Sequence, residues 1–204
     1  MTMVIQDRHM AQIYIRERRA SGNDRWDEVW DGTYLLMPNP NVEHQDIATG
    51  LASIFRATLD WQHRGKTYQG VNVSDQPDDW THNYRCPDVA VYLPDNPAKL
   101  RGSYWLGGPD FVVEIISPDD RSRQKFDFYA KVGVRELLLV DRDPWALELY
   151  QRRGTEWKLA GTSKPEQSDS LTSEVLLLTF RLVPSSARPI IEVIHADGNQ
   201  KWTV

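Results

Sequence analysis

The stretch that decides the fold reads Asp110-Phe111-Val112-Val113-Glu114-Ile115-Ile116, an apolar run interrupted by one carboxylate. Such a run predicts a buried strand, and because strand side chains alternate between faces, Val112, Glu114 and Ile116 share one face. Burying a carboxylate among apolar side chains is costly unless it is paired with a cation or bound to a metal. Glu114 therefore needs a partner, and either a salt bridge to a neighbouring Lys or Arg or a metal ion would serve.

Asp88 provides a second carboxylate, because it follows Pro87 and opens the strand predicted over residues 88–93. An aspartate after a proline is often a simple turn residue, and that interpretation stays open. If the two strands are neighbours, Asp88 and Glu114 form the kind of oxygen pair that Mg²⁺ binds together with water and a substrate phosphate. A metal held in this way polarises a phosphoryl oxygen and lowers the pKa of a bound water.

Phosphodiester hydrolysis also needs a cation beside the developing negative charge. The position two residues after the glutamate holds Ile116, which cannot serve. The helix expected over residues 121–132 offers Lys125 instead, one helical turn from both Arg121 and Tyr129. Most helical lysines are simply solvated, so Lys125 becomes a candidate only because the two carboxylates are present.

The rest of the chain supplies the elements that surround this strand. The periodicity predicts a helix over residues 6–20, a hairpin from strands 25–30 and 33–37 around Asp31-Gly32, a helix over 42–62, and strands over 67–73, 136–141, 146–151, 157–160 and 175–182. A linker over 184–189 leads to a terminal hairpin over 190–195 and 201–204 around Asp197-Gly198. This order predicts an α/β fold with a mixed, largely antiparallel central sheet flanked by helices.

Composition restricts the class of protein further. A chain of 204 residues with 26% charged and 40% hydrophobic residues fits one globular domain. The single cysteine, Cys86, excludes an internal disulfide and a cysteine-rich zinc cluster. No apolar run approaches the roughly 18 residues that a membrane span needs, and residues 1–19 lack a signal-peptide core, so we expect a cytoplasmic protein with no membrane partner. The net charge of −5 weighs against a broad basic nucleic-acid face.

Three segments together carry a family resemblance. They are Tyr84-Arg85-Cys86-Pro87-Asp88-Val89-Ala90-Val91-Tyr92, then Phe111-Val112-Val113-Glu114-Ile115-Ile116-Ser117-Pro118, then Lys125 with Tyr129-Ala130, Gly133-Val134 and residues 136–141. In order and spacing they resemble the Uma-type family of bacterial restriction endonucleases. Upstream, residues 27–32 followed by Pro40 and His44 are similar to that family's first hairpin and long helix, and the resemblance spans residues 6–182.

The resemblance implies a restriction-endonuclease-like, PD-(D/E)xK core over residues 1–183, with residues 184–204 as a C-terminal linker and hairpin extension. It implies that the catalytic lysine has moved from the strand to the adjoining helix, which would account for Ile116. Asp88 and Glu114 become ligands of Mg²⁺ or Mn²⁺, and Lys125 becomes the catalytic lysine. Glu28 becomes an auxiliary ligand or water-orienting group. Residues expected to help position the substrate are His44, Arg121 and Tyr129.

The function implied is that of a metal-dependent endonuclease that hydrolyses DNA phosphodiester bonds, with DNA as partner and a homodimer allowed. Two other functions stay open: a catalytically silent nuclease-fold module that binds nucleic acid or protein, and a metal-dependent hydrolase of smaller phosphoesters. The chain departs from the family at Asp119-Asp120, where small polar residues are usual, so negative charge is added beside the expected site. The terminal hairpin lies outside the resemblance and could serve dimerisation, edge protection or packing.

Overall fold

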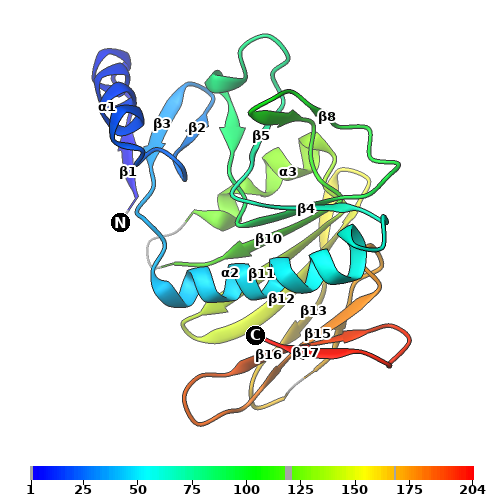
Figure 1. Ribbon diagram of the computed structural model, residues 1–204. Coiled ribbons are helices and arrows are strands. Elements are labelled where there is room, and N and C mark those ends of the chain that lie inside the picture. The colour runs from blue at the N-terminus through cyan, green and yellow to red at the C-terminus, as the bar shows by residue number, and fades with distance from the viewer. Residues whose placement is uncertain (1, 118–120, 168) are drawn as a thin grey trace.

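The structure is a computed structural model that describes residues 2–117, 121–167 and 169–204. The expectation for Asp119-Asp120 lies outside these described residues. The chain forms three sheets and three α-helices in the described residues, and Figure 1 shows α2 (Val42–Phe55) lying along the central strands. In the described part of the chain, no helix is long and apolar enough to cross a membrane.

The central sheet has six strands in the order β13-β12-β11-β10-β7-β4. Their bounds are β4 Lys66–Gln69, β7 Val89–Tyr92, β10 Phe111–Ile115, β11 Glu136–Arg142, β12 Trp145–Arg153 and β13 Glu156–Ser163. β10 and β11 are parallel, whereas the other four neighbouring pairs are antiparallel. A parallel pair needs a crossover, which α3 (Phe126–Val132) provides. The predicted mixed, largely antiparallel sheet is confirmed.

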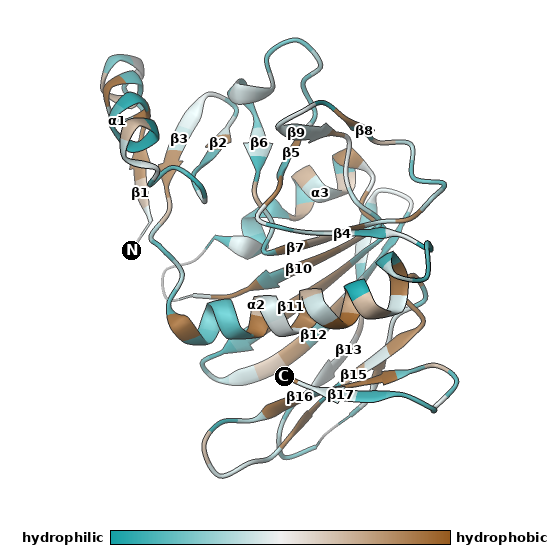
Figure 2. Ribbon diagram, in the orientation of Figure 1, coloured by the Kyte–Doolittle hydropathy of each residue, from teal (hydrophilic) through white to brown (hydrophobic). Residues whose placement is uncertain are grey.

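Helices cover both faces of this sheet. Alternate side chains of β10, beginning with Phe111 and Val113, pack in one apolar cluster with α2 (Val42–Phe55). Val112 packs on the opposite face with Phe128 and Tyr129 of α3. Figure 2 shows the hydrophobic residues of α2 and of the central strands gathered where these layers meet. Glu114 has the same strand parity as Val112, so it points toward α3.

A seven-stranded sheet lies beside the central one, in the order β1-β3-β2-β6-β5-β9-β8. Its strands are β1 Met3–Ile5, β2 Glu28–Trp30, β3 Thr33–Leu36, β5 Asn72–Ser74, β6 Tyr84–Arg85, β8 Lys99–Leu100 and β9 Tyr104–Leu106. β2 and β3 form the expected hairpin, whose turn residues Asp31 and Gly32 both have positive φ, at 47° and 82°. α1 (Arg8–Ser21) packs against β1 and ends at Gly22.

Three sequence expectations needed correction. The strand expected over 67–73 divides at Gly70 into β4 and β5, which belong to different sheets, because Gly70 takes a left-handed φ of 59°. The helix expected over 42–62 is α-helical only to Phe55 and continues as a π-helical segment, Arg56–Asp60. The helix expected over 121–132 opens as a 3₁₀ segment, Ser122–Lys125. Elsewhere in the chain, a short 3₁₀ turn spans Trp80–His82.

The C-terminal residues form a four-stranded sheet, β14 (Leu171–Thr172), β15 (Leu178–Val183), β16 (Ile190–His195) and β17 (Lys201–Thr203). The terminal hairpin is confirmed, while the strand expected over 175–182 begins later, after Leu177, whose φ is 55°. Phe180 of β15 meets Phe55 of α2 edge to face at 6.2 Å. The expected division after residue 183 falls between β15 and β16, which pair with each other, and it stays a prediction.

Candidate active site

Two strands of the central sheet bring the candidate carboxylates to one edge. β7 is antiparallel to β10 with Val89 opposite Val113, so Asp88, just before Val89, comes beside Glu114, just after Val113. The Oδ2 atom of Asp88 accepts a hydrogen bond of 2.7 Å from the backbone N–H of Ile115, which fixes its carboxylate against β10. The pairing that the sequence could only assume is therefore present.

Glu114 is 2% exposed and is surrounded by donors from the segment that follows it. The Nζ atom of Lys125 donates to both of its carboxylate oxygens at 3.0 Å, and the hydroxyl of Tyr129 donates to Oε1. The pKa of Glu114 is raised to about 8, chiefly by burial; Lys125 opposes this rise, and the negative charges of Asp88 and Glu28 add to it. Glu114 is thus a carboxylate held in an environment that disfavours its negative charge.

Lys125 connects this carboxylate to the N-terminal hairpin. It ends the 3₁₀ segment before α3, is 3% exposed, and places Nζ 2.8 Å from Oε1 of Glu28. Glu28 is itself held by the backbone N–H of Cys86 at 2.9 Å and by the indole N–H of Trp30 at 2.7 Å. The strand position two residues after Glu114 holds Ile116 and provides no lysine. Lys125, from the segment that follows the strand, instead lies between two carboxylates.

His44 occupies the first turn of α2, where the side chain of Asn41 caps the helix through the His44 backbone N–H. Its ring nitrogen Nε2 lies 2.8 Å from Oδ1 of Asp88, and Nδ1 lies 3.3 Å from Oγ of Ser117. Arg142, at the end of β11, donates to the same Oγ atom at 3.2 Å. A hydrogen-bonded chain therefore runs from Asp88 through His44 and Ser117 to Arg142.

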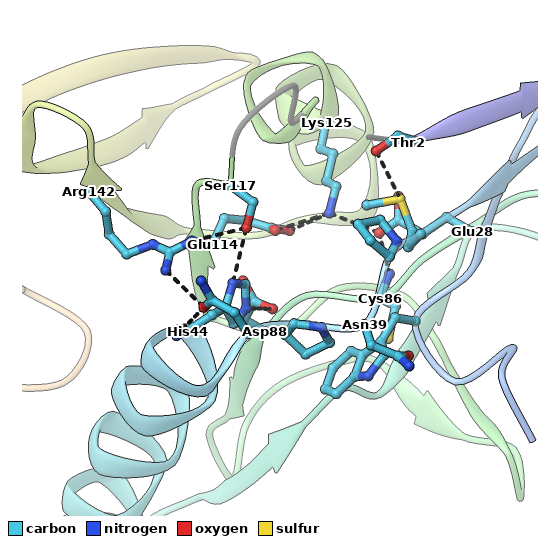
Figure 3. Close-up of a pocket in the computed structure, with 15 residues that line it drawn as sticks. Thr2, Glu28, Asn39, His44, Cys86, Asp88, Glu114, Ser117, Lys125 and Arg142 are labelled. Atoms are coloured by element: carbon cyan, nitrogen blue, oxygen red, sulfur yellow. Dashed lines mark hydrogen bonds and ion pairs between the residues drawn. The ribbon is translucent and has the colours of Figure 1, made fainter.

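These side chains line a cavity of about 250 Å³ (Figure 3). Figure 3 shows Lys125, Glu28, His44 and Arg142 converging on it from different segments. The polar side of the wall consists of Glu28, Asn41, His44, Asp88, Glu114, Ser117, Lys125 and Arg142, with Thr2 and Asn39. The apolar side consists of Trp26, Met37, Pro38 and Pro40, with Cys86.

Five of the seven sequence-predicted site residues, Glu28, His44, Asp88, Glu114 and Lys125, line this one cavity. Tyr129 reaches it only through Glu114. Arg121 is not among the lining residues, and its carbonyl accepts the backbone N–H of Gln124 where the 3₁₀ segment begins. The roles assigned to these residues stay predictions.

Arg142, Ser117 and Trp26 also line the cavity, although the sequence analysis assigned none of them a role in the site. Arg142 could be placed at the site only once β10 and β11 were known to be parallel, because the carboxyl ends of parallel neighbours meet at one edge and Arg142 ends β11. Trp26 had no sequence signal, because its place depends on how the first hairpin packs against the central sheet.

A divalent cation can be tested against these donors. In the described residues, no group of three or more His, Cys, Asp or Glu side chains is arranged to hold a metal ion. Asp88 and Glu114 nonetheless fit Mg²⁺ or Mn²⁺, which bind one or two carboxylates and complete their shell with water and substrate oxygen. Glu114 and Glu28 share the ammonium group of Lys125, and the negative charge of Asp88 also acts on Glu114, so a bound cation would relieve the repulsion among these three carboxylates.

The central mixed sheet thus brings two carboxylates and a lysine together at one edge. Five solved chains match, among them one from Anabaena variabilis ATCC 29413 described as "a putative nuclease belonging to DUF820". It is 18% identical, with a TM-score of 0.60 over 74% of this chain and 82% of that chain, which shows the fold. No curated protein matches. Residues 15–184 match the Uma2 family, described as "Putative restriction endonuclease", and the chain belongs to that family.

Proposed function

We propose that the protein is a metal-dependent endonuclease that hydrolyses DNA phosphodiester bonds. The observation that carries this proposal is the convergence of Asp88, Glu114 and Lys125, from three separate segments, on one cavity. Asp88 and Glu114 would hold Mg²⁺ or Mn²⁺, which when bound polarises a phosphoryl oxygen and lowers the pKa of a water. Membership of the Uma2 family supports the same activity.

The remaining side chains have roles that follow from their contacts. Lys125 presents a buried ammonium group to the cavity, where it stabilises negative charge developing on the phosphate. Glu28 holds that ammonium in place at 2.8 Å, and Tyr129 orients the Glu114 carboxylate. His44 holds Asp88 through Nε2 and, being tied to Ser117 through Nδ1, keeps the Asp88 carboxylate facing the cavity.

The test is a cleavage assay on supercoiled plasmid and on circular single-stranded DNA, with Mg²⁺ or Mn²⁺ and with a chelator. The parent protein is expected to cut, whereas Glu114→Ala and Lys125→Ala, purified identically, should lose at least about 100-fold in rate. Equal cutting by the parent and both variants would show a contaminating nuclease or a wrong site.

One observation favours the silent-module alternative. Lys125 contacts both Glu114 and Glu28, so each of these two carboxylates has a partner without any metal. A silent module would show no metal-dependent cleavage of any of these DNA substrates. Competition between nucleotides and DNA in the same assay separates the smaller-phosphoester alternative.

A further inference from the structure

A second hollow continues from the candidate active site. Its volume is about 230 Å³, and it shares four lining residues with the first cavity, namely Trp26, Pro40, His44 and Asp88. Beyond them it is lined by Arg25, by the α2 residues Gln45, Ala48 and Thr49, and by Gln69 of β4. The two hollows therefore meet at Trp26, where a polar, mostly uncharged groove leads away from the carboxylates.

Trp26 is held at this junction by the backbone beneath it. A Cβ atom added to Gly70 would lie 2.5 Å from the Trp26 ring, so the indole packs directly on a glycine whose φ is +59°. The rest of the ring is half-exposed and lines both hollows. The exposed Arg25 holds its guanidinium over the ring, 4.9 Å from the centroid, so a base stacks on this face when the Arg25 side chain swings outward. An aromatic surface fixed in this way is suited to stacking against another flat ring.

The reacting groups are buried side chains that lie next to Trp26 in the lining of the first cavity. Glu114 and Lys125 are 2% and 3% exposed, and Asp88 is 9% exposed. They line a cavity of about 250 Å³. A base can reach the ring of Trp26 beside them only when it is unpaired or drawn out of the helix, because a paired base is stacked between its neighbours. The position of Trp26 next to the reacting groups therefore favours a strand that is already unpaired.

We propose that this site takes unpaired, single-stranded DNA, with a base stacked on Trp26 and the neighbouring phosphate at Asp88, Glu114 and Lys125. This inference rests on the proposed function, because it assigns the substrate class of the same site. Arg25 neutralises a phosphate at the outer end of the groove, which supplies local positive charge in a chain whose net charge is −5. Gln45, Thr49 and Gln69 offer hydrogen bonds to base edges, and such contacts tolerate several bases.

The test measures binding without cleavage, in a chelator. Fluorescence anisotropy compares a fluorescein-labelled 12-nucleotide single strand with a blunt duplex of the same sequence, at one ionic strength. The single strand should bind at least about tenfold more tightly than the duplex. Trp26→Leu, which removes the aromatic face, should weaken single-strand binding about five- to 100-fold, while Trp26→Phe should keep most of it. Trp61→Leu, at a tryptophan that is 73% exposed and lines neither hollow, is the matched control.

Equal affinity for both DNA forms would overturn the inference, and so would equal single-strand binding by the Leu and Phe variants of Trp26. The plasmid assay separates these failures from failure of the proposed function. Metal-dependent cutting of duplex and single-stranded DNA at equal rates would retain the nuclease and remove the strand preference. Trp26-dependent single-strand binding without any cleavage would retain the groove as a binding site and remove the nuclease.

Discussion

Glu114 and Glu136 are both 2% exposed and lie on the neighbouring parallel strands β10 and β11, yet their surroundings differ. Glu136, opposite Phe111 where the two strands begin, accepts hydrogen bonds from the hydroxyl of Ser173 at 2.5 Å and the backbone N–H of Glu174 at 2.9 Å. Glu114, toward the other end of the pair, is bound by an ammonium and a phenol, lines a cavity and faces two further carboxylates.

Burial alone therefore does not separate a structural carboxylate from a functional one. Neutral donors that are part of the fold satisfy Glu136 and attach the segment before β15 to the central sheet. Glu114 instead shares its surroundings with like charges, which destabilises its ionised form and leaves an advantage for a bound cation. The two residues lie at opposite ends of the β10–β11 pair, and this position makes Glu136 a structural carboxylate and Glu114 a candidate functional one.

Substitutions at Glu114 and Glu136 should differ most in their effect on the rate of DNA cleavage. Glu114→Gln should lower the rate of metal-dependent DNA cleavage by about 100-fold or more, because it removes a carboxylate from the proposed metal site. Glu136→Gln should stay within about threefold of the parent, since Glu136 does not line the cavity. Rates are compared per folded protein, with the folded fraction taken from circular dichroism. A Glu136 variant as inactive as the Glu114 variant would break the comparison.

For the stability of the fold, the substitution at Glu136 should have the larger effect and the one at Glu114 the smaller. Glu136→Ala leaves the buried Ser173 hydroxyl and the Glu174 backbone N–H without their acceptor, which should lower the free energy of unfolding by about 2–4 kcal/mol. Glu114→Gln should cost about 1 kcal/mol or less, because it also removes a charge that burial disfavours. Urea unfolding of the metal-free proteins measures both values, and a larger loss at position 114 would contradict the assignment.

The pH dependence of stability should differ as well. The folded state raises the pKa of Glu114 to about 8, so it binds this proton more tightly than the unfolded chain does. The resulting stabilisation is fully present below the unfolded-state value near 4.5 and is lost as pH rises through about 8. Urea midpoints measured from pH 5 to pH 9 should fall more steeply for the parent than for Glu114→Gln. Parallel curves would mean that Glu114 is ionised throughout.

The smallest effect is expected at His44, which acts through Asp88. His44→Ala should lower cleavage about tenfold and change the urea midpoint little, because Asp88 keeps its hydrogen bond from the Ile115 backbone. His9→Ala, at an exposed position on α1, is the matched control. If His44→Ala were as inactive as Glu114→Gln, His44 would have to touch the reacting atoms directly.

Local sequence signals predicted much of this structure. The Asp31-Gly32 pair predicted its hairpin because few other dipeptides adopt two positive φ values, and strand alternation put Glu114 on the face opposite Phe111 and Val113. Local signals could not predict the features that depend on contacts between distant segments. The register of Val89 against Val113, the passage of the chain between sheets at Gly70, and the position of Trp26 all depend on packing between distant segments.

The residues of the candidate site also divide into those that local sequence signals could predict and those that depend on long-range packing. Asp88, Glu114 and Lys125 could be proposed from residue type and spacing, and the family resemblance added Glu28. Arg142 was reachable only through the parallel pairing of β10 with β11, which periodicity does not reveal. Arg121 was selected for its helical spacing from Lys125, but that segment opens as a 3₁₀ helix, where residues four apart do not share a face.

Calorimetric titration with Mn²⁺ tests the central claim most directly, because it needs neither DNA nor turnover. The parent should bind Mn²⁺, and Asp88→Asn should bind it at least about tenfold more weakly, while Glu136→Gln binds as the parent does. Absence of binding by the parent, or binding that Asp88→Asn leaves unchanged, would contradict a metal site at the edge where β7 begins and β10 ends.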